Sequence, residues 1–243
     1  MAPTINTDDS RAIKILDAAG IKYTLSTETT QTPVAVTDPG NVWTIEGVNY
    51  RGKIIPVVLS KELLPAMNLS QMTAYAKKAM KTGEPYSANA QLVYAIAKRA
   101  KKQGNTEVRE FMKDAIFSQY PNTLSVVRYN PGKKLDEIVH NPGLSNEYSS
   151  KVSFVSPDEW VNGSTRKEDY KMLLGSNKPA DVDDVFEWIT GKSAYMYKVN
   201  AKPDSVDERV VRLNADSGWF GLDCVRYPQG ALASFGVSLP QKI

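Results

Sequence analysis

Few side chains suited to acid–base or nucleophilic chemistry occur in this sequence, and they lie far apart. The only histidine, His140, is part of the turn-forming run Val-His-Asn-Pro-Gly, and no Gly-x-Ser-x-Gly pattern that would present a nucleophilic serine is found. A hydrolase built on serine, histidine and a carboxylate would have to use this one residue. We therefore interpret His140 as a turn-capping or packing residue.

Paired carboxylates offer another route to general acid and base catalysis. Asp158 and Glu159 form one such pair, and Asp183 and Asp184 form a second. Both pairs are predicted at or near helix starts, where carboxylates stabilise the helix dipole. A structural role therefore explains them.

The single cysteine, Cys224, cannot form an internal disulfide, and one cysteine with one histidine cannot supply a zinc site. It alternates with Asp223 and Val225 in a strand pattern, which favours a small buried side chain over a reactive thiol. Neither a Gly-x-x-x-x-Gly-Lys-Ser/Thr nor a Gly-x-Gly-x-x-Gly pattern is present, so no motif supports nucleotide binding. We expect no cofactor and no metal.

Basic residues gather in one place, the run Lys98-Arg99-Ala100-Lys101-Lys102. Leu92, Ile96 and Ala100 give this segment an apolar helical face opposite the cations, which favours a solvated helix face. A nucleic-acid-binding helix at 98–102 is the alternative. The formal net charge of +3 over 243 residues makes no demand for nucleic acid as a partner.

The elements around these residues predict an α+β protein. A short helix is expected over Asp8–Ala19, and a β-hairpin is expected over Val42–Tyr50 and Lys53–Leu59. Apolar spacing and end residues predict further helices over 72–80, 92–100, 108–115, 165–174 and 179–190. Later strands are expected over 124–129, 152–155, 194–199, 208–213, 222–227 and 235–239.

Two features bear on location. No apolar run approaches the ~20 residues that cross a bilayer, and the first residues lack the basic and apolar parts of a secretory signal. We expect a soluble protein, cytoplasmic by default, with surface display through a partner left open.

The C-terminal segment 208–237 carries the most informative pattern. A strand leads to the loop Ser217-Gly218-Trp219, followed by a strand with Asp223-Cys224-Val225-Arg226, a loop at Pro228 and a final strand with Gly236-Val237. This order resembles the closing segment of C-type-lectin-like proteins related to the formylglycine-generating-enzyme family, where the segment hosts the variable region of diversity-generating retroelements. The runs at 130–132, 138–141, 185–189 and 208–210 resemble archaeal (nanoarchaeal) variable proteins of this kind.

This resemblance implies a C-type-lectin-like fold over 41–243, with helices inserted between early and late antiparallel strands, a variable region at about 214–237 and an N-terminal extension over 1–40. It also implies a non-enzymatic protein that binds a ligand, expected to be a protein, through its hypervariable C-terminal surface. The formylglycine-generating enzymes need two active-site cysteines, and calcium-dependent lectins use Glu-Pro-Asn-like and Trp-Asn-Asp-like ligands. Neither set is present, so we expect neither oxidase chemistry nor a calcium-bound sugar site. A hydrolase-like enzyme of unknown substrate remains an alternative, and neither the ligand nor the oligomeric state can be predicted.

The candidate ligand-binding positions lie in this segment. Strand alternation predicts two faces, an inward one with Leu222, Cys224 and Arg226 and an outward one with Asp223, Val225 and Tyr227. Retroelement mutagenesis acts at adenines, typically in asparagine codons, and cannot produce Trp or Gln, so Trp219 fits less well and Gln229 is left out. The candidates, expected to form one exposed patch, are Gly218, Trp219, Phe220, Asp223, Val225, Tyr227, Gly230, Ala231, Leu232 and Ala233. The alternative is that the aromatic residues among them complete the core.

Overall fold

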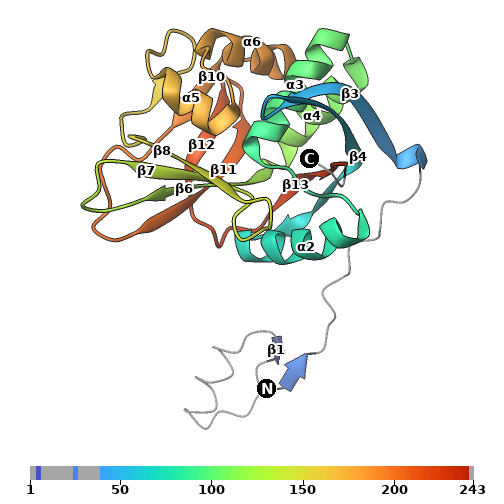
Figure 1. The fold of residues 1–243 in the computed structure, drawn as a ribbon, viewed down its shortest axis with the longest axis horizontal. Helices are drawn as coiled ribbons and strands as arrows, with labels where there is room; N and C mark the ends of the chain where they lie inside the picture. Colours follow the sequence, from blue (N-terminus) through green and yellow to red (C-terminus); the bar gives the residue numbers. More distant parts are fainter. Residues whose placement is uncertain (1–3, 7–23, 27–38, 241–243) are drawn as a thin grey trace. The chain divides into compact units, whose positions relative to one another are not determined.

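The computed structural model describes residues 4–6, 24–26 and 39–240 (Figure 1). The chain divides into two compact units, Met1–Val34 and Ala35–Ile243. In the first unit, β1 (Thr4–Asn6) pairs in parallel with β2 (Thr24–Ser26). The helix predicted over Asp8–Ala19 lies outside the described residues.

The second unit is an α+β fold with two sheets (Figure 1). The larger sheet has the strand order β8-β7-β6-β11-β12-β10-β9, with bounds β6 Asn122–Tyr129, β7 Asp136–His140, β8 Tyr148–Val152, β9 Glu159–Trp160, β10 Ala194–Tyr197, β11 Asp207–Ala215 and β12 Phe220–Arg226. The smaller sheet has the order β3-β4-β13-β5, with bounds β3 Val42–Tyr50, β4 Lys53–Met67, β5 Tyr86–Ser87 and β13 Leu232–Ser238, and a 3-10 turn, η1 (Pro39–Asn41), precedes it.

One pair in the larger sheet corrects the expectation that the late strands are antiparallel. β10 and β12 run parallel, with Tyr195 opposite Gly221. The reason lies in the connection between them. β11 forms an antiparallel hairpin with β12 and lies on the far side of it from β10, so that β12 returns in the direction of β10.

The helices are α2 Leu69–Thr82, α3 Ala90–Gln103, α4 Thr106–Ser118, α5 Lys167–Leu174 and α6 Pro179–Thr190. The predicted runs fall inside these helices, except that α5 begins two residues later than expected. α3 begins after Asn89, because the side chain of Asn89 accepts the N–H of Leu92 at 2.9 Å. Ser87 belongs to β5, where its hydroxyl lies 2.7 Å from that of Ser234. None of the helices in the described ranges is long and apolar enough to span a membrane.

The predicted β-hairpin around residues 51 and 52 is confirmed, although β4 continues to Met67. Its second half pairs with β13, with Leu63 opposite Phe235, which explains the extra length. A strand that the pattern missed is β7, which starts at the fully buried Asp136. Its carboxylate accepts the N–H groups of Asn130 and Phe154, so tertiary contacts make this polar residue part of the interior.

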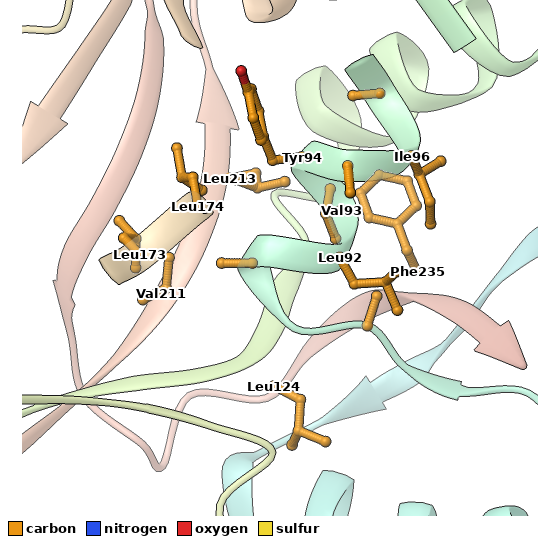
Figure 2. Close-up of a cluster of buried hydrophobic side chains, with 14 of the residues drawn as sticks. Leu92, Val93, Tyr94, Ile96, Leu124, Leu173, Leu174, Val211, Leu213 and Phe235 are labelled. Atoms are coloured by element: carbon orange, nitrogen blue, oxygen red, sulfur yellow. The ribbon is translucent and has the colours of Figure 1, made fainter. Parts of the chain in front are cut away.

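Helix α3 forms the centre of the core and contacts β3, β6 and the other helices α4, α5 and α6. Leu92 and Ile96 meet Phe235 of β13 on one side of the helix, while Leu173 and Leu213 belong to the other side (Figure 2). Only the last turns of α3 carry charged residues. This helix therefore joins the two sheets through its apolar first half.

The two faces of the larger sheet are covered differently. On the inner face, Phe186 of α6 stacks on Phe220 of β12 with ring centroids 4.3 Å apart. On the outer face, Leu69 at the start of α2 packs on Val126 and Val210, in a cluster separate from the main core. The outer face at the other end of the sheet, at β10 and β9, carries half-exposed aromatic side chains.

Candidate functional site: the aromatic edge of the larger sheet

The turn between β11 and β12 is fixed by Asp216. Its carboxylate accepts the N–H of Gly218 at 2.7 Å and that of Trp219 at 3.1 Å, while its own N–H donates to the Trp219 carbonyl at 3.2 Å. Lys192 holds the turn from the outside, because its Nζ donates to the Ser217 carbonyl at 2.7 Å. These bonds place the Trp219 side chain in one position at the end of β12.

Strand alternation brings two tyrosines to the same face as this tryptophan. Ala194 and Met196 of β10 are fully buried, whereas Tyr195 and Tyr197 between and after them are half-buried. β9 pairs with β10 so that Trp160 lies opposite Tyr195. Residues from three separate parts of the sequence therefore meet at one corner of the sheet.

We call Trp160, Tyr195, Tyr197 and Trp219 the aromatic edge. The Tyr195 ring lies in the middle, with centroids 5.1 Å from Trp160, 5.1 Å from Tyr197 and 6.2 Å from Trp219. The indole N–H of Trp219 donates to the Tyr197 hydroxyl at 2.6 Å. Two T-shaped ring contacts, one tilted contact and this hydrogen bond hold the group rigid.

The aromatic edge borders a hollow. Trp160 has 51% of its surface exposed, which is high for a tryptophan in a sheet. Beside it lies an open cavity with a volume of ≈ 460 Å³. Its lining includes Trp160, Asn162, Glu187, Lys192 and Gly218. Rigid rings next to a hollow with a few polar groups are typical of a recognition surface.

The sheet beneath the aromatic edge holds polar atoms without partners. A Cβ at Gly221 would collide with the Asn214 side chain and lie 3.1 Å from Cε2 of Tyr197, so only glycine allows these groups to approach. Asn214 Oδ1 and Arg212 Nε are buried and have no hydrogen-bond partner within the described part of the chain. Buried polar atoms normally find partners, so these two are exceptions, and their burial keeps a ligand on this face from reaching them.

Two of the ten predicted ligand-binding positions are buried, and the expectation that they face solvent is wrong. Phe220 is fully buried against Phe186 on the inner face of the sheet. Asp223 is 1% exposed, although it does lie on the outer face, because Arg212 and Arg226 cover its carboxylate at 2.8 Å and 2.7 Å. Alternation assigned Asp223 to the correct face of β12, but it did not show that arginines cover that face.

The predicted inward set is right for Leu222 and Cys224, which are both fully buried. Burial raises the pKa of the Cys224 thiol well above its usual value, which fits a packing role. Arg226 corrects the prediction, since its side chain is 54% exposed. The register between β11 and β12 shifts between the pairs Arg212–Asp223 and Val210–Arg226, which puts Arg226 on the same face as Asp223, and Arg226 donates to the Asp223 carboxylate.

The remaining predicted positions do not form a single patch, contrary to expectation. Gly218 is exposed and Trp219 half-buried at one end of β12, whereas the others lie at or beyond its opposite end, about 20 Å away for a strand of this length. Tyr227 is 63% exposed, with the Arg209 guanidinium 3.7 Å from its ring centroid. In this second group Tyr227, Gly230 and Ala231 are exposed, and Val225, Leu232 and Ala233 are half-buried.

His140 is a packing residue, as one of the two sequence interpretations states. Its Nε2 lies 3.0 Å from the Met172 carbonyl, which can only accept, so Nε2 carries the proton. Its Nδ1 lies 2.7 Å from Ser125 Oγ and accepts from it, while that oxygen accepts the Ala90 N–H at 2.9 Å. Both Ser125 and His140 are fully buried, so a substrate cannot reach this serine–histidine pair. The turn after β7 is formed by Asn141 instead, whose φ is +55°.

Another charged group was missed by the sequence interpretation. Lys198 continues the alternation that buries Ala194 and Met196. Its fully buried ammonium group pairs with Glu159 and, at 3.2 Å, with Asp169. Arg166 also binds Asp169, at 2.6 Å. Partial burial alone would raise the pKa of Glu159, but hydrogen bonds from Lys198 and Ser164 hold this pKa below its usual value. The ion pairs of Lys198 therefore connect the end of β10 to β9 and α5 beneath the aromatic edge.

The acidic pairs singled out from the sequence also have structural partners. Asp158 accepts the backbone N–H of Lys198 at 2.8 Å, and Asp183 accepts that of Ala194 at 2.6 Å. Asp184 pairs with Lys101 on the surface. Asp158 precedes β9 and Glu159 lies in it, well before α5 begins at Lys167, so the predicted place near a helix start is wrong for this pair. Within the described ranges, no three His, Cys, Asp or Glu side chains are grouped as a metal site.

Comparisons with protein-family models, with curated proteins and with solved structures gave no match. The fold class and the site geometry therefore carry the functional argument.

Proposed function

We propose that this chain is a non-enzymatic ligand-binding protein and that the aromatic edge is its recognition surface. The observation that carries the proposal is the meeting of four aromatic side chains from β9, β10 and the 216–219 turn at one half-exposed corner. Trp and Tyr dominate binding energy at protein interfaces, because they offer large rigid surfaces with a polar tip. Four such rings have no evident role in the core of this fold.

A protein is the partner that we propose for this surface. The ring faces supply apolar contact area, while the tyrosine hydroxyls, Lys192 and Glu187 supply a polar rim. No nucleic acid is required, since the aromatic edge carries no cluster of cations.

The 216–219 turn is suited to variation. A Cβ at Gly218 would meet only the Asp216 carboxylate, at 3.4 Å, so other residues fit there. Gly230 in the second loop is equally open, with its nearest neighbour at 3.6 Å. Together with the resemblance of segment 208–237, this supports an archaeal-type variable protein of a diversity-generating retroelement, with a C-type-lectin-like fold. We place it in the cytoplasm unless a partner displays it at the surface.

Display selection tests this proposal. A library of the full chain, randomised at Ser217 and Gly218, is selected against a panel of folded proteins, and the binders are then changed by Trp160→Ala with Tyr195→Ala. We expect selected clones to lose at least about tenfold in affinity, as for hot-spot aromatics. The matched control is Tyr227→Ala, which removes an exposed aromatic ring at the other end of β12.

The control separates the two ends of β12. Unchanged affinity in Tyr227→Ala supports the aromatic edge. A library that yields no binders, or binders that lose affinity only in Tyr227→Ala, would refute it. Circular dichroism and thermal unfolding of each variant exclude misfolding as the cause.

A further inference from the structure

A second cavity lies on another part of the molecule, between the β3–β4 turn, α3 and the end of α5. Its volume is ≈ 530 Å³, within the range of small-molecule sites. Four cationic side chains line it, Arg51 from the turn and Lys98, Arg99 and Lys102 from α3. No aspartate or glutamate is among its lining residues.

Two of these cations are held in place by their neighbours. Arg99 Nε donates to the Glu46 carbonyl at 2.6 Å, and its guanidinium lies so close to Gly47 that a Cβ there would be 2.8 Å from Nη2. The Arg51 guanidinium lies over the Tyr148 ring, 4.0 Å from its centroid. Fixed guanidinium groups lose little conformational entropy when an anion binds.

The positive charge of the cavity is largely unneutralised. Only Lys98 has a carboxylate partner, Asp181 at 3.6 Å, and both side chains are about half exposed. For Arg51, Arg99 and Lys102, no carboxylate oxygen within the described ranges comes within 4 Å. Like charges brought together in a concave site repel one another, and a bound anion relieves that repulsion.

The cavity also has an apolar wall. Tyr94 leaves α3 on the side away from Ile96 and Phe235 (Figure 2), and it lines the cavity with Leu174 and Ile54. Ile54 is 67% exposed, unusual for a large aliphatic side chain in a hairpin. A ligand that fits both walls has an anionic part and a flat or apolar part.

We propose that this cavity binds a phosphorylated small molecule of nucleotide size. Phosphate suits the site because guanidinium groups bind its oxygens in pairs and lysines add point charges. The basic run 98–102 was interpreted as a solvated helix face, and the pattern on α3 alone could not reveal that Arg51 of a distant turn faces it. The site is separate from the aromatic edge and does not depend on the function proposed for it.

Calorimetric titration of the full chain with adenosine monophosphate, pyrophosphate and adenosine tests the proposal. We expect saturable binding of the first two, weaker at high salt, and none of adenosine. Lys102→Glu should lower the affinity for adenosine monophosphate by at least about tenfold, since it replaces an attraction with a repulsion inside the cavity. Lys102 is exposed, so the variant should fold.

The matched control is Lys78→Glu, which makes the same charge change at an exposed position on α2 outside the cavity. Affinity within about twofold of the unchanged chain supports a local site, since an exposed distant charge is screened by salt. Absence of saturable binding, or equal losses in both variants, would overturn the proposal. So would a single-stranded oligonucleotide that displaces adenosine monophosphate far below the concentration of the free nucleotide, because it would identify a nucleic-acid surface.

Discussion

Acidification should destabilise this protein through His140, whose imidazole is neutral in the folded chain. Burial lowers the pKa of His140 to about 4 from 6.5, the hydrogen bond to the Met172 carbonyl opposes this shift, and the positive charge of Arg51 adds to it. Protonation would place a proton on Nδ1, which accepts a hydrogen bond from Ser125. The folded chain therefore resists protonation.

The direction and the size of this change in stability follow from the pKa of His140 in the unfolded and the folded chain. Below pH 6.5 the unfolded chain binds a proton at this residue, whereas the folded chain does not until about pH 4. Stability is thus present at neutral pH and is lost as the pH falls between these values. Each pH unit in this window costs about 1.4 kcal/mol, so the step from pH 7 to pH 5 removes about 2 kcal/mol.

Urea unfolding of the unchanged chain and of His140→Gln, each at pH 7 and pH 5, measures this contribution. Glutamine does not titrate, and its amide can donate to the Met172 carbonyl and accept from Ser125 in part. Other groups contribute equally to both proteins, so the unchanged chain should lose about 2 kcal/mol more than the variant. Equal losses in the two proteins would refute the assignment of His140 as a buried neutral imidazole.

Four further substitutions, three in the interior and one at the exposed Tyr227, are each tested by urea unfolding at pH 7. Asp223→Ala should cost about 3 kcal/mol, because it leaves the largely buried Arg212 without its carboxylate, and a cost below about 1 kcal/mol would contradict the pairing. Phe220→Ala should cost about 3–5 kcal/mol and Tyr227→Ala less than about 1 kcal/mol, and similar costs would show that burial does not distinguish them. Lys198→Met should cost about 3 kcal/mol at pH 7 and less at acidic pH, since protonation neutralises the carboxylates left behind, whereas a pH-independent cost would argue against the charge cluster.

Local signals predicted the helices well. α6 runs over Pro179–Thr190 and ends at Gly191, as expected, because a proline at the first helical position and a glycine in the left-handed conformation mark its ends. β7 and β9 were missed because they are short and begin with acidic residues that only tertiary partners neutralise. Asp136 needs Lys202, at 3.0 Å, and Glu159 needs Lys198.

The candidate site could be predicted only in part. Gly218 and Trp219 were found from the pattern of the C-terminal segment. Tyr195 and Tyr197 were missed, although their alternation with buried residues on a strand was a usable signal. Trp160 gave none, because its place beside Tyr195 depends on the pairing of β9 with β10. Period-two alternation assigns the faces of a strand, but it does not show which face other side chains cover.

The central claim is that exposed positions of the C-terminal segment vary so that the surface binds different ligands. Sequencing the DNA that flanks the gene tests it most directly. We predict a nearly identical copy of the segment encoding residues 214–237, differing at adenines, beside a reverse-transcriptase gene, with changed codons at exposed positions such as Gly218 and not at Phe220. A single copy of the segment with no reverse transcriptase nearby, or changes concentrated at buried positions, would contradict the account.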